Sequence, residues 1–150
     1  MVQLRHVGIY TRNLEMMTAF YKQAFNMHMI CENVIQSDAL IKDLLHDENA
    51  AVKISKLITE QGKINGYGDM VELIAVDFDF AKQNTKIFER QIFDVGCTHT
   101  AFYVNDINET VKKIIALGGE AKTKIHEMPN GAKCCFCVDP EKNWLELIQR

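Results

Sequence analysis

The sequence lacks a surplus of positive charge, a long apolar run and a rich supply of proline. Seventeen Lys and Arg against 20 Asp and Glu give a formal net charge of −3, so we expect no nucleic-acid partner. The longest apolar stretches have the length of a strand, which argues against a membrane partner. The chain begins in a predicted strand and shows no signal peptide, so we expect a cytoplasmic protein.

Cysteine is also too sparse and too irregular for a disulfide framework. The five cysteines are an odd number in a chain of 150 residues, which favours a reducing compartment. Cys134 and Cys137 form a C-x-x-C pattern, but they lie in a predicted strand, where residues three apart point to opposite faces. A redox motif of this kind opens a helix instead. We therefore interpret both as small apolar strand residues.

The chain does contain an internal repeat. The segments 5–10 and 98–103 each carry a histidine and run as a strand into an amphipathic segment, and Glu-Leu-Ile recurs at 72–74 and 146–148. The first copy is longer, because 66 positions separate its His from its Glu and only 47 do so in the second. We place the extra residues at 35–50 and 58–69. The glycine-rich stretch 62–68 is interpreted either as a mobile loop over a site or as a hairpin tip.

Hydrophobic periodicity predicts an α+β protein of two β-α-β-β-β modules. The first module, about 1–76, has strands at 3–10, 28–34, 52–57 and 70–76 and a helix from Asn13 to about Met27. The second, about 97–150, has strands at 97–104, 121–126, 132–138 and 144–149 and a helix at 107–117. A linker of about 77–96 joins them. We expect one domain over 1–150.

The repeat places one His and one Glu in each module. His6 and His99 begin matching strands, and Glu72 and Glu146 lie mid-strand between apolar neighbours, where an unpaired carboxylate is costly to bury. Two His and two Glu are a suitable ligand set for one divalent metal. The competing interpretation is four structurally satisfied polar residues. Without a thiolate, the set suits Ni²⁺, Co²⁺, Zn²⁺ or Mn²⁺.

Strand periodicity also predicts which side chains line the cavity beside these ligands. The candidate pocket residues share faces with the four ligands and are Tyr10, Met70, Ile74, Tyr103 and Trp144. The other three histidines have no counterpart in the opposite module, so we interpret them as surface or supporting residues. They are His28, His46 and His126.

The same segments resemble a known superfamily. The matching pieces are His6-Val7-Gly8-Ile9, Val71-Glu72-Leu73-Ile74, Thr98-His99-Thr100-Ala101-Phe102, Gly131-Ala132-Lys133, Asp139-Pro140 and Leu145-Glu146-Leu147. They resemble the vicinal oxygen chelate superfamily, which has the glyoxalase I and bleomycin-resistance fold. The resemblance implies an incomplete eight-stranded barrel, or cup, with the helices outside and one divalent metal inside. The longer first module is closer to the glyoxalase-related lyases.

The order His, Glu, His, Glu resembles that of bacterial glyoxalase I and of some epimerases. It differs from the two-His, one-Glu set of the extradiol dioxygenases and fosfomycin-resistance enzymes, and from methylmalonyl-CoA epimerase, where Gln usually stands at the position of Glu72. The resemblance implies a metal-dependent lyase or isomerase that moves a proton through a metal-bound enediolate of a small vicinal-oxygen substrate. Glu146 is the expected base, and Glu72 acts on the opposite face.

Three alternatives stand beside this function. The first is an epimerase of a methylmalonyl-CoA-like or sugar-like substrate, and the second is a non-catalytic drug-binding resistance protein. The four-ligand set argues against the second. An iron dioxygenase is disfavoured because four protein ligands leave too few positions for substrate and O₂. We also expect a homodimer, because each module leaves a sheet edge to cover.

Overall fold

The computed structural model describes residues 2–78, 82–83 and 85–150. These residues divide into two compact units, of which the first holds Met1–Lys22 and Asn26–Lys86 and the second holds Gln23–Phe25 and Ile87–Arg150. Part of the predicted linker lies outside the described residues. Among those described, no helix combines the length and the apolar character that a bilayer crossing needs.

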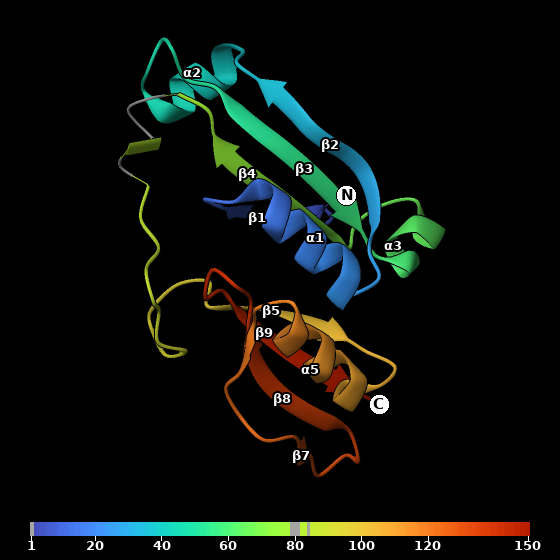
Figure 1. Ribbon diagram of the computed structural model, residues 1–150. Helices are drawn as coiled ribbons and strands as arrows, with labels where there is room; N and C mark the ends of the chain where they lie inside the picture. Colours follow the sequence, from blue (N-terminus) through green and yellow to red (C-terminus); the bar gives the residue numbers. More distant parts are fainter. Residues whose placement is uncertain (1, 79–81, 84) are drawn as a thin grey trace. The chain divides into compact units, whose positions relative to one another are not determined.

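The first unit contains a mixed sheet with helices between its strands (Figure 1). Its elements are β1 (His6–Tyr10), α1 (Leu14–Ala24), β2 (His28–Gln36), α2 (Ala39–Leu45), β3 (Val52–Ile58), α3 (Glu60–Asn65) and β4 (Met70–Val76). The strands lie in the order β1-β4-β3-β2, with β1 parallel to β4 and the other neighbours antiparallel. This order places the first and last strands of the module side by side.

The second unit repeats this topology. Its elements are β5 (His99–Tyr103), α5 (Ile107–Ala116), β6 (Glu120–Ala121), β7 (His126–Glu127), β8 (Lys133–Val138) and β9 (Trp144–Gln149). The order is β5-β9-β8-β6, with β7 also paired to β8, and β5 runs parallel to β9. The predicted α+β class and its two β-α-β-β-β modules are confirmed. The predicted strand at 121–126 is wrong in detail, because two short strands replace it.

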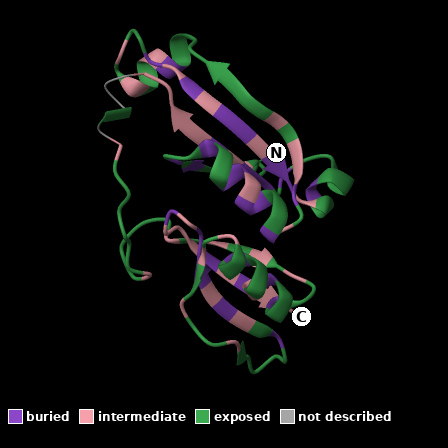
Figure 2. Cartoon of the chain, in the orientation of Figure 1, coloured by how far each residue is buried: buried purple, intermediate pink, exposed green. Residues whose placement is uncertain are grey.

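Apolar spacing explains the two helices that the sequence predicts. In α1 the buried residues are Leu14, Met17, Phe20, Tyr21 and Ala24, which lie on one face of the helix. The side chain of Asn13 accepts a hydrogen bond from the backbone N–H of Met16 at 3.0 Å, as expected of an N-cap. The helix ends at Ala24, three residues before the predicted end. In Figure 2 the buried residues of the first unit follow α1 and the middle strands of its sheet.

The extra residues of the first module are partly helical. In α2, Ile41 and Leu45 pack on Ala50, Val52 and Ile54, and Ile74 and Phe78 complete this apolar cluster. The glycine-rich stretch is not a hairpin tip, which corrects that interpretation, whereas its mobility over a site stays a prediction. Its first half is α3, with Thr59 as N-cap and Gly66 as a left-handed C-cap at φ 77°.

An ion-pair cluster closes the end of β4. The carboxylate of Asp77 lies 2.7 Å from Lys82 Nζ and 3.4 Å from Lys53 Nζ. The hydrogen bond from Lys82, helped by the positive charge of Lys53, lowers the pKa of Asp77 below its ordinary value.

Candidate functional site

In the first unit, His6 and Glu72 come together across the parallel pair β1 and β4. Register pairs His6 with Met70 and Gly8 with Glu72, so the two side chains share one face of the sheet. His6 Nε2 lies 2.9 Å from Glu72 Oε2, and the side chains are 34% and 13% exposed. The structure therefore brings together the two predicted ligands of this module.

A lysine that the sequence analysis missed joins this pair. Lys56 is directly opposite Glu72 in the antiparallel register of β3 and β4. Its Nζ lies 2.8 Å from Glu72 Oε1, and its side chain is 22% exposed. Each oxygen of the Glu72 carboxylate thus has a nitrogen partner. The one signal in the sequence is a Lys at a position that periodicity assigns to an apolar face, between Ile54 and Ile58.

The second unit repeats the His–Glu contact with a different third member. His99 Nε2 lies 3.3 Å from Glu146 Oε2 across β5 and β9. Glu146 Oε1 accepts a hydrogen bond from the Cys134 thiol at 3.3 Å. Burial, together with the neighbouring Glu146 carboxylate, raises the pKa of Cys134 to about 11. Cys134 is therefore a neutral hydrogen-bond donor to Glu146, which corrects its interpretation as an apolar strand residue.

The predicted strand around the cysteines is confirmed as β8. Cys135 and Cys137 are buried, at 2% and 0% exposure, and fit the apolar interpretation. Because the thiol of Cys134 has a raised pKa and lies in a strand, it lacks the lowered pKa that a redox C-x-x-C requires.

The pocket residues predicted for the first module differ in their surroundings. Tyr10 is 50% exposed, whereas Met70 is 5% exposed and belongs to the core. Ile74 is partly buried and packs against the apolar cluster beneath α2. Of these three, Tyr10 is therefore the most exposed, at about half of its surface.

In the second module the predicted pocket residues belong to a set of aromatic contacts. Tyr103 is 66% exposed, and the Arg150 guanidinium lies 4.2 Å from its ring centre. Trp144 donates its indole N–H to the carbonyl of Arg90 at 2.7 Å. Phe136, which the sequence analysis did not single out, lies edge-on between His99 and Trp144, with ring centres at 5.5 and 6.4 Å. Glu146 therefore has an aromatic flank.

The spacing of each His–Glu pair fits two ligands of one metal. Metal bonds of about 2.0–2.2 Å and angles between 90° and 110° separate neighbouring ligand atoms by about 2.8–3.6 Å. The observed separations of 2.9 and 3.3 Å lie in this range. Across the described residues, no group of three or more His, Cys, Asp or Glu forms a metal site. The convergence of all four residues on one metal stays a prediction.

The remaining histidines lie apart from these pairs. His28 Nε2 lies 2.5 Å from Glu60 Oε2, a contact that joins the start of β2 to α3. His46 is the left-handed C-cap of α2, and His126 is exposed in β7. The structure thus gives each of the three a position consistent with a surface or supporting role.

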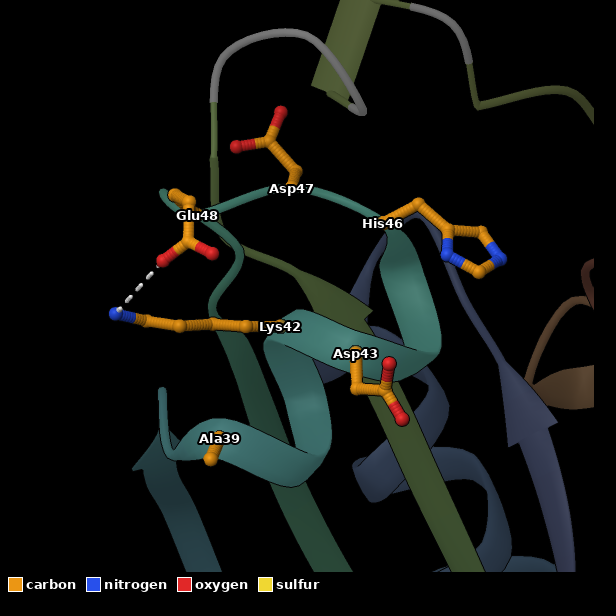
Figure 3. A pocket seen from close by; sticks show the side chains of 6 residues that line it. All are labelled: Ala39, Lys42, Asp43, His46, Asp47 and Glu48. Atoms are coloured by element: carbon orange, nitrogen blue, oxygen red, sulfur yellow. Dashed lines mark ion pairs between the residues drawn. The ribbon is translucent and has the colours of Figure 1, made fainter.

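One hollow on the described residues is lined by side chains outside these pairs. It measures about 510 Å³ and lies along α2 and the turn that follows it, where the lining residues are Ala39, Lys42, Asp43, His46, Asp47 and Glu48. Figure 3 shows these side chains spread around the turn, with the Lys42–Glu48 ion pair at 3.9 Å. None of the predicted site residues lines it. Its charged, divergent lining gives no reason to place the chemistry there.

The fold, the repeat and the paired residues define the class of protein. The chain belongs to the glyoxalase/bleomycin resistance protein/dioxygenase superfamily, whose family model matches residues 3–147. No curated protein sequence matches the chain.

Solved structures agree with this assignment. A glyoxalase family protein from Bacillus cereus has 16% identity and a TM-score of 0.80, and the match covers 99% of this chain and 94% of that one. A fosfomycin resistance protein, FosX, from Listeria monocytogenes has 16% identity and a TM-score of 0.63, with 100% and 92% covered. A variant of the Listeria protein is described in complex with Mn(II) and a dihydroxypropylphosphonic acid. At these identities the likeness establishes the fold.

Proposed function

We propose that this protein is a metal-dependent lyase or isomerase of the glyoxalase I type. Its substrate would be a small molecule with two adjacent oxygens. The observation that carries the proposal is the repeated His–Glu contact, at 2.9 Å in one module and 3.3 Å in the other, on matching strands. A duplicated pair of potential ligands is hard to explain as an ordinary surface ion pair, which would have no reason to recur at the same register.

The metal would be held by His6, Glu72, His99 and Glu146, a set of nitrogen and oxygen donors suited to Ni²⁺, Co²⁺, Zn²⁺ or Mn²⁺. When bound, the metal supplies Lewis-acid stabilisation of negative charge that develops on a substrate oxygen. This proposed set of four ligands is our reason for grouping the chain with the glyoxalase-related lyases of the superfamily.

Glu146 is the better candidate for the proton acceptor. Its Oε1 is held by a neutral thiol, which orients the carboxylate without placing a competing cation beside it. Glu72 instead has an ammonium 2.8 Å from Oε1. We therefore assign removal of the substrate proton to Glu146 and its return, on the opposite face, to Glu72.

An epimerase uses the same two carboxylates and is the nearest alternative. Glu72 and Glu146 would then exchange a proton at one carbon of a coenzyme A thioester or a sugar-like substrate. A drug-binding resistance protein is the alternative outside catalysis, and it would need neither metal nor proton transfer.

The deciding experiment combines metal analysis with proton exchange. Purified protein is stripped of metal, titrated with Ni²⁺, Co²⁺, Zn²⁺ and Mn²⁺, and incubated in D₂O with candidate substrates. These are α-hydroxy and α-keto acids, coenzyme A thioesters and the methylglyoxal–glutathione adduct. We expect one metal per chain and metal-dependent deuterium incorporation. Tight drug binding without metal would support the resistance protein instead, and absence of metal binding would refute the proposal.

A further inference from the structure

Lys56 is an unusual residue for its place in the sheet. It lies in β3 between Ile54 and Ile58, which are 6% and 8% exposed, and all three share one face of the strand. Its side chain is only 22% exposed, although lysines are rarely so covered without a partner. The partner is Glu72, which is the predicted metal ligand of this module.

The second module shows that the fold does not require this cation. The two sheets have the same strand order, and the residue opposite Glu146 in the register of β8 and β9 is Phe136. The position opposite the glutamate is therefore a cation in one module and an aromatic ring in the other. Both modules have the His–Glu contact. They therefore differ in the residue opposite the glutamate and not in the His–Glu pair itself.

The cation opposite Glu72 changes the net charge around the proposed metal. This step rests on the function proposed above. In the proposed ligand set, the carboxylates of Glu72 and Glu146 would offset the charge of a divalent metal, and His6 and His99 would be the other two ligands. The ammonium of Lys56, 2.8 Å from Glu72 Oε1, would then add a positive charge that these ligands do not offset.

Among the described residues, the ammonium keeps hydrogen-bonding capacity beyond its contact with Glu72. A lysine has three donors, and the contact with Glu72 Oε1 uses one of them. We propose that Lys56 is a specificity-determining residue that selects substrates with an anionic substituent, such as a carboxylate or a phosphoryl group, beside the two chelating oxygens. Among small molecules with two adjacent oxygens, the substrates would then be anions.

The test uses three probes that chelate metal through the same hydroxamate oxygens. Acetohydroxamate has no further charge, malonomonohydroxamate adds a carboxylate, and phosphonoacetohydroxamate adds a phosphonate. Their affinities for Co²⁺-loaded protein are measured by calorimetry for the wild type and for Lys56→Met, Lys56→Gln and Lys56→Arg. The wild type should bind at least one charged probe about tenfold or more tightly than acetohydroxamate, and the preference should shrink in high salt.

Lys56→Met and Lys56→Gln should bind the three probes with equal affinity, whereas Lys56→Arg should keep the preference. Neither neutral variant should bind Co²⁺ more weakly than the wild type, because each removes a competing cation. If Lys56 only neutralises Glu72 for folding, the probe preference will persist in both neutral variants while their melting temperature falls, and the inference is overturned. The two neutral variants differ in polarity, so a folding defect in one leaves the other as the test.

Failure of the role of Lys56 and failure of the proposed metal site give different results. If wild-type protein binds Co²⁺ and acetohydroxamate but shows no preference for either charged probe, the role of Lys56 is wrong and the proposed metal site stands. If the wild type binds neither Co²⁺ nor any hydroxamate, the proposed function is wrong and the inference falls with it.

Discussion

Replacing His6 by alanine should remove metal-linked stability while leaving the metal-free protein nearly intact. The contact of His6 with Glu72 is partly exposed, and such pairs contribute about 0–1 kcal/mol. Glu72 keeps its second partner, Lys56, at 2.8 Å. The buried His6 Nδ1 has no hydrogen-bond partner within the described part of the chain, so the substitution breaks no bond there. For a chain of this size, we expect the metal-free melting temperature to fall by at most about 2–4 °C.

The effect on the metal-bound protein should be larger. A ligand at 100 times its dissociation constant stabilises the folded state by about 2.7 kcal/mol, which corresponds to a rise of roughly 5–11 °C in the wild type. His6→Ala should lose most of this rise at the same metal concentration, and His99→Ala should do the same, since each histidine supplies one of the proposed ligands.

The matched control is His28→Ala. It also removes a His–Glu contact, the one with Glu60, and its side chain is 38% exposed against 34% for His6. Thermal melts with and without Co²⁺, each after metal stripping, should show the full metal-induced rise in this variant. If His6→Ala keeps the full rise, His6 is not a ligand. If His28→Ala loses it as well, the metal is acting through a general effect on folding.

Four further outcomes are expected. Glu146→Gln should keep the fold and reduce turnover by about 10²–10⁴-fold on a substrate found by deuterium exchange, whereas Cys135→Ala should change stability and leave turnover near the wild type. At pH 8, iodoacetamide should modify exposed Cys97 much faster than Cys134, since a thiol of pKa about 11 is ionised in roughly one molecule in a thousand, and peptide mass spectrometry reads both sites. Asp77→Asn should destabilise the protein at pH 7. The difference in denaturant melts should begin to shrink below about pH 4 and vanish once the pH has fallen through the lowered pKa of Asp77, because the carboxyl stabilises the fold only while it is ionised. We also propose a homodimer, and a monomer in size-exclusion chromatography with light scattering at micromolar concentration would contradict it.

The His–Glu pairs could be predicted because two independent regularities agreed. The repeat aligned His6 with His99 and Glu72 with Glu146, and the period of two placed each residue on a defined strand face. Parallel pairing of the first and last strands then brings each His beside its Glu.

The third members of the pairs could not be predicted, because they depend on register between strands. Lys56 contacts Glu72 because the β3–β4 pairing places the two residues directly opposite each other. Cys134 lies two residues from Phe136, the residue that pairs with Glu146, and still reaches its carboxylate. Cross-strand register is set by turn geometry and packing together, so a single sequence does not fix it.

The helices of the longer first module were missed although their capping signals were present. Asp38 accepts hydrogen bonds from Leu40 N and Ile41 N at the start of α2, and Thr59 accepts one from Gly62 N in α3. Glycine suggested a loop, yet Gly62 is helical and packed tightly. A Cβ at that position would approach the Gly68 carbonyl oxygen to 2.8 Å, so glycine here permits close packing rather than mobility.

The two modules share some features of the site and differ in others. The His–Glu contact is common to both, and a shared metal would constrain both copies equally, because loss of either pair leaves too few ligands. The partner of each carboxylate is not under that constraint, and there the modules differ: an ammonium on Glu72 and a thiol on Glu146. Under the proposed function, the retained residues would hold the metal, and the divergent ones would divide proton transfer and substrate charge between the two halves. Lys56 is therefore a sharper test of specificity than any of the four proposed ligands.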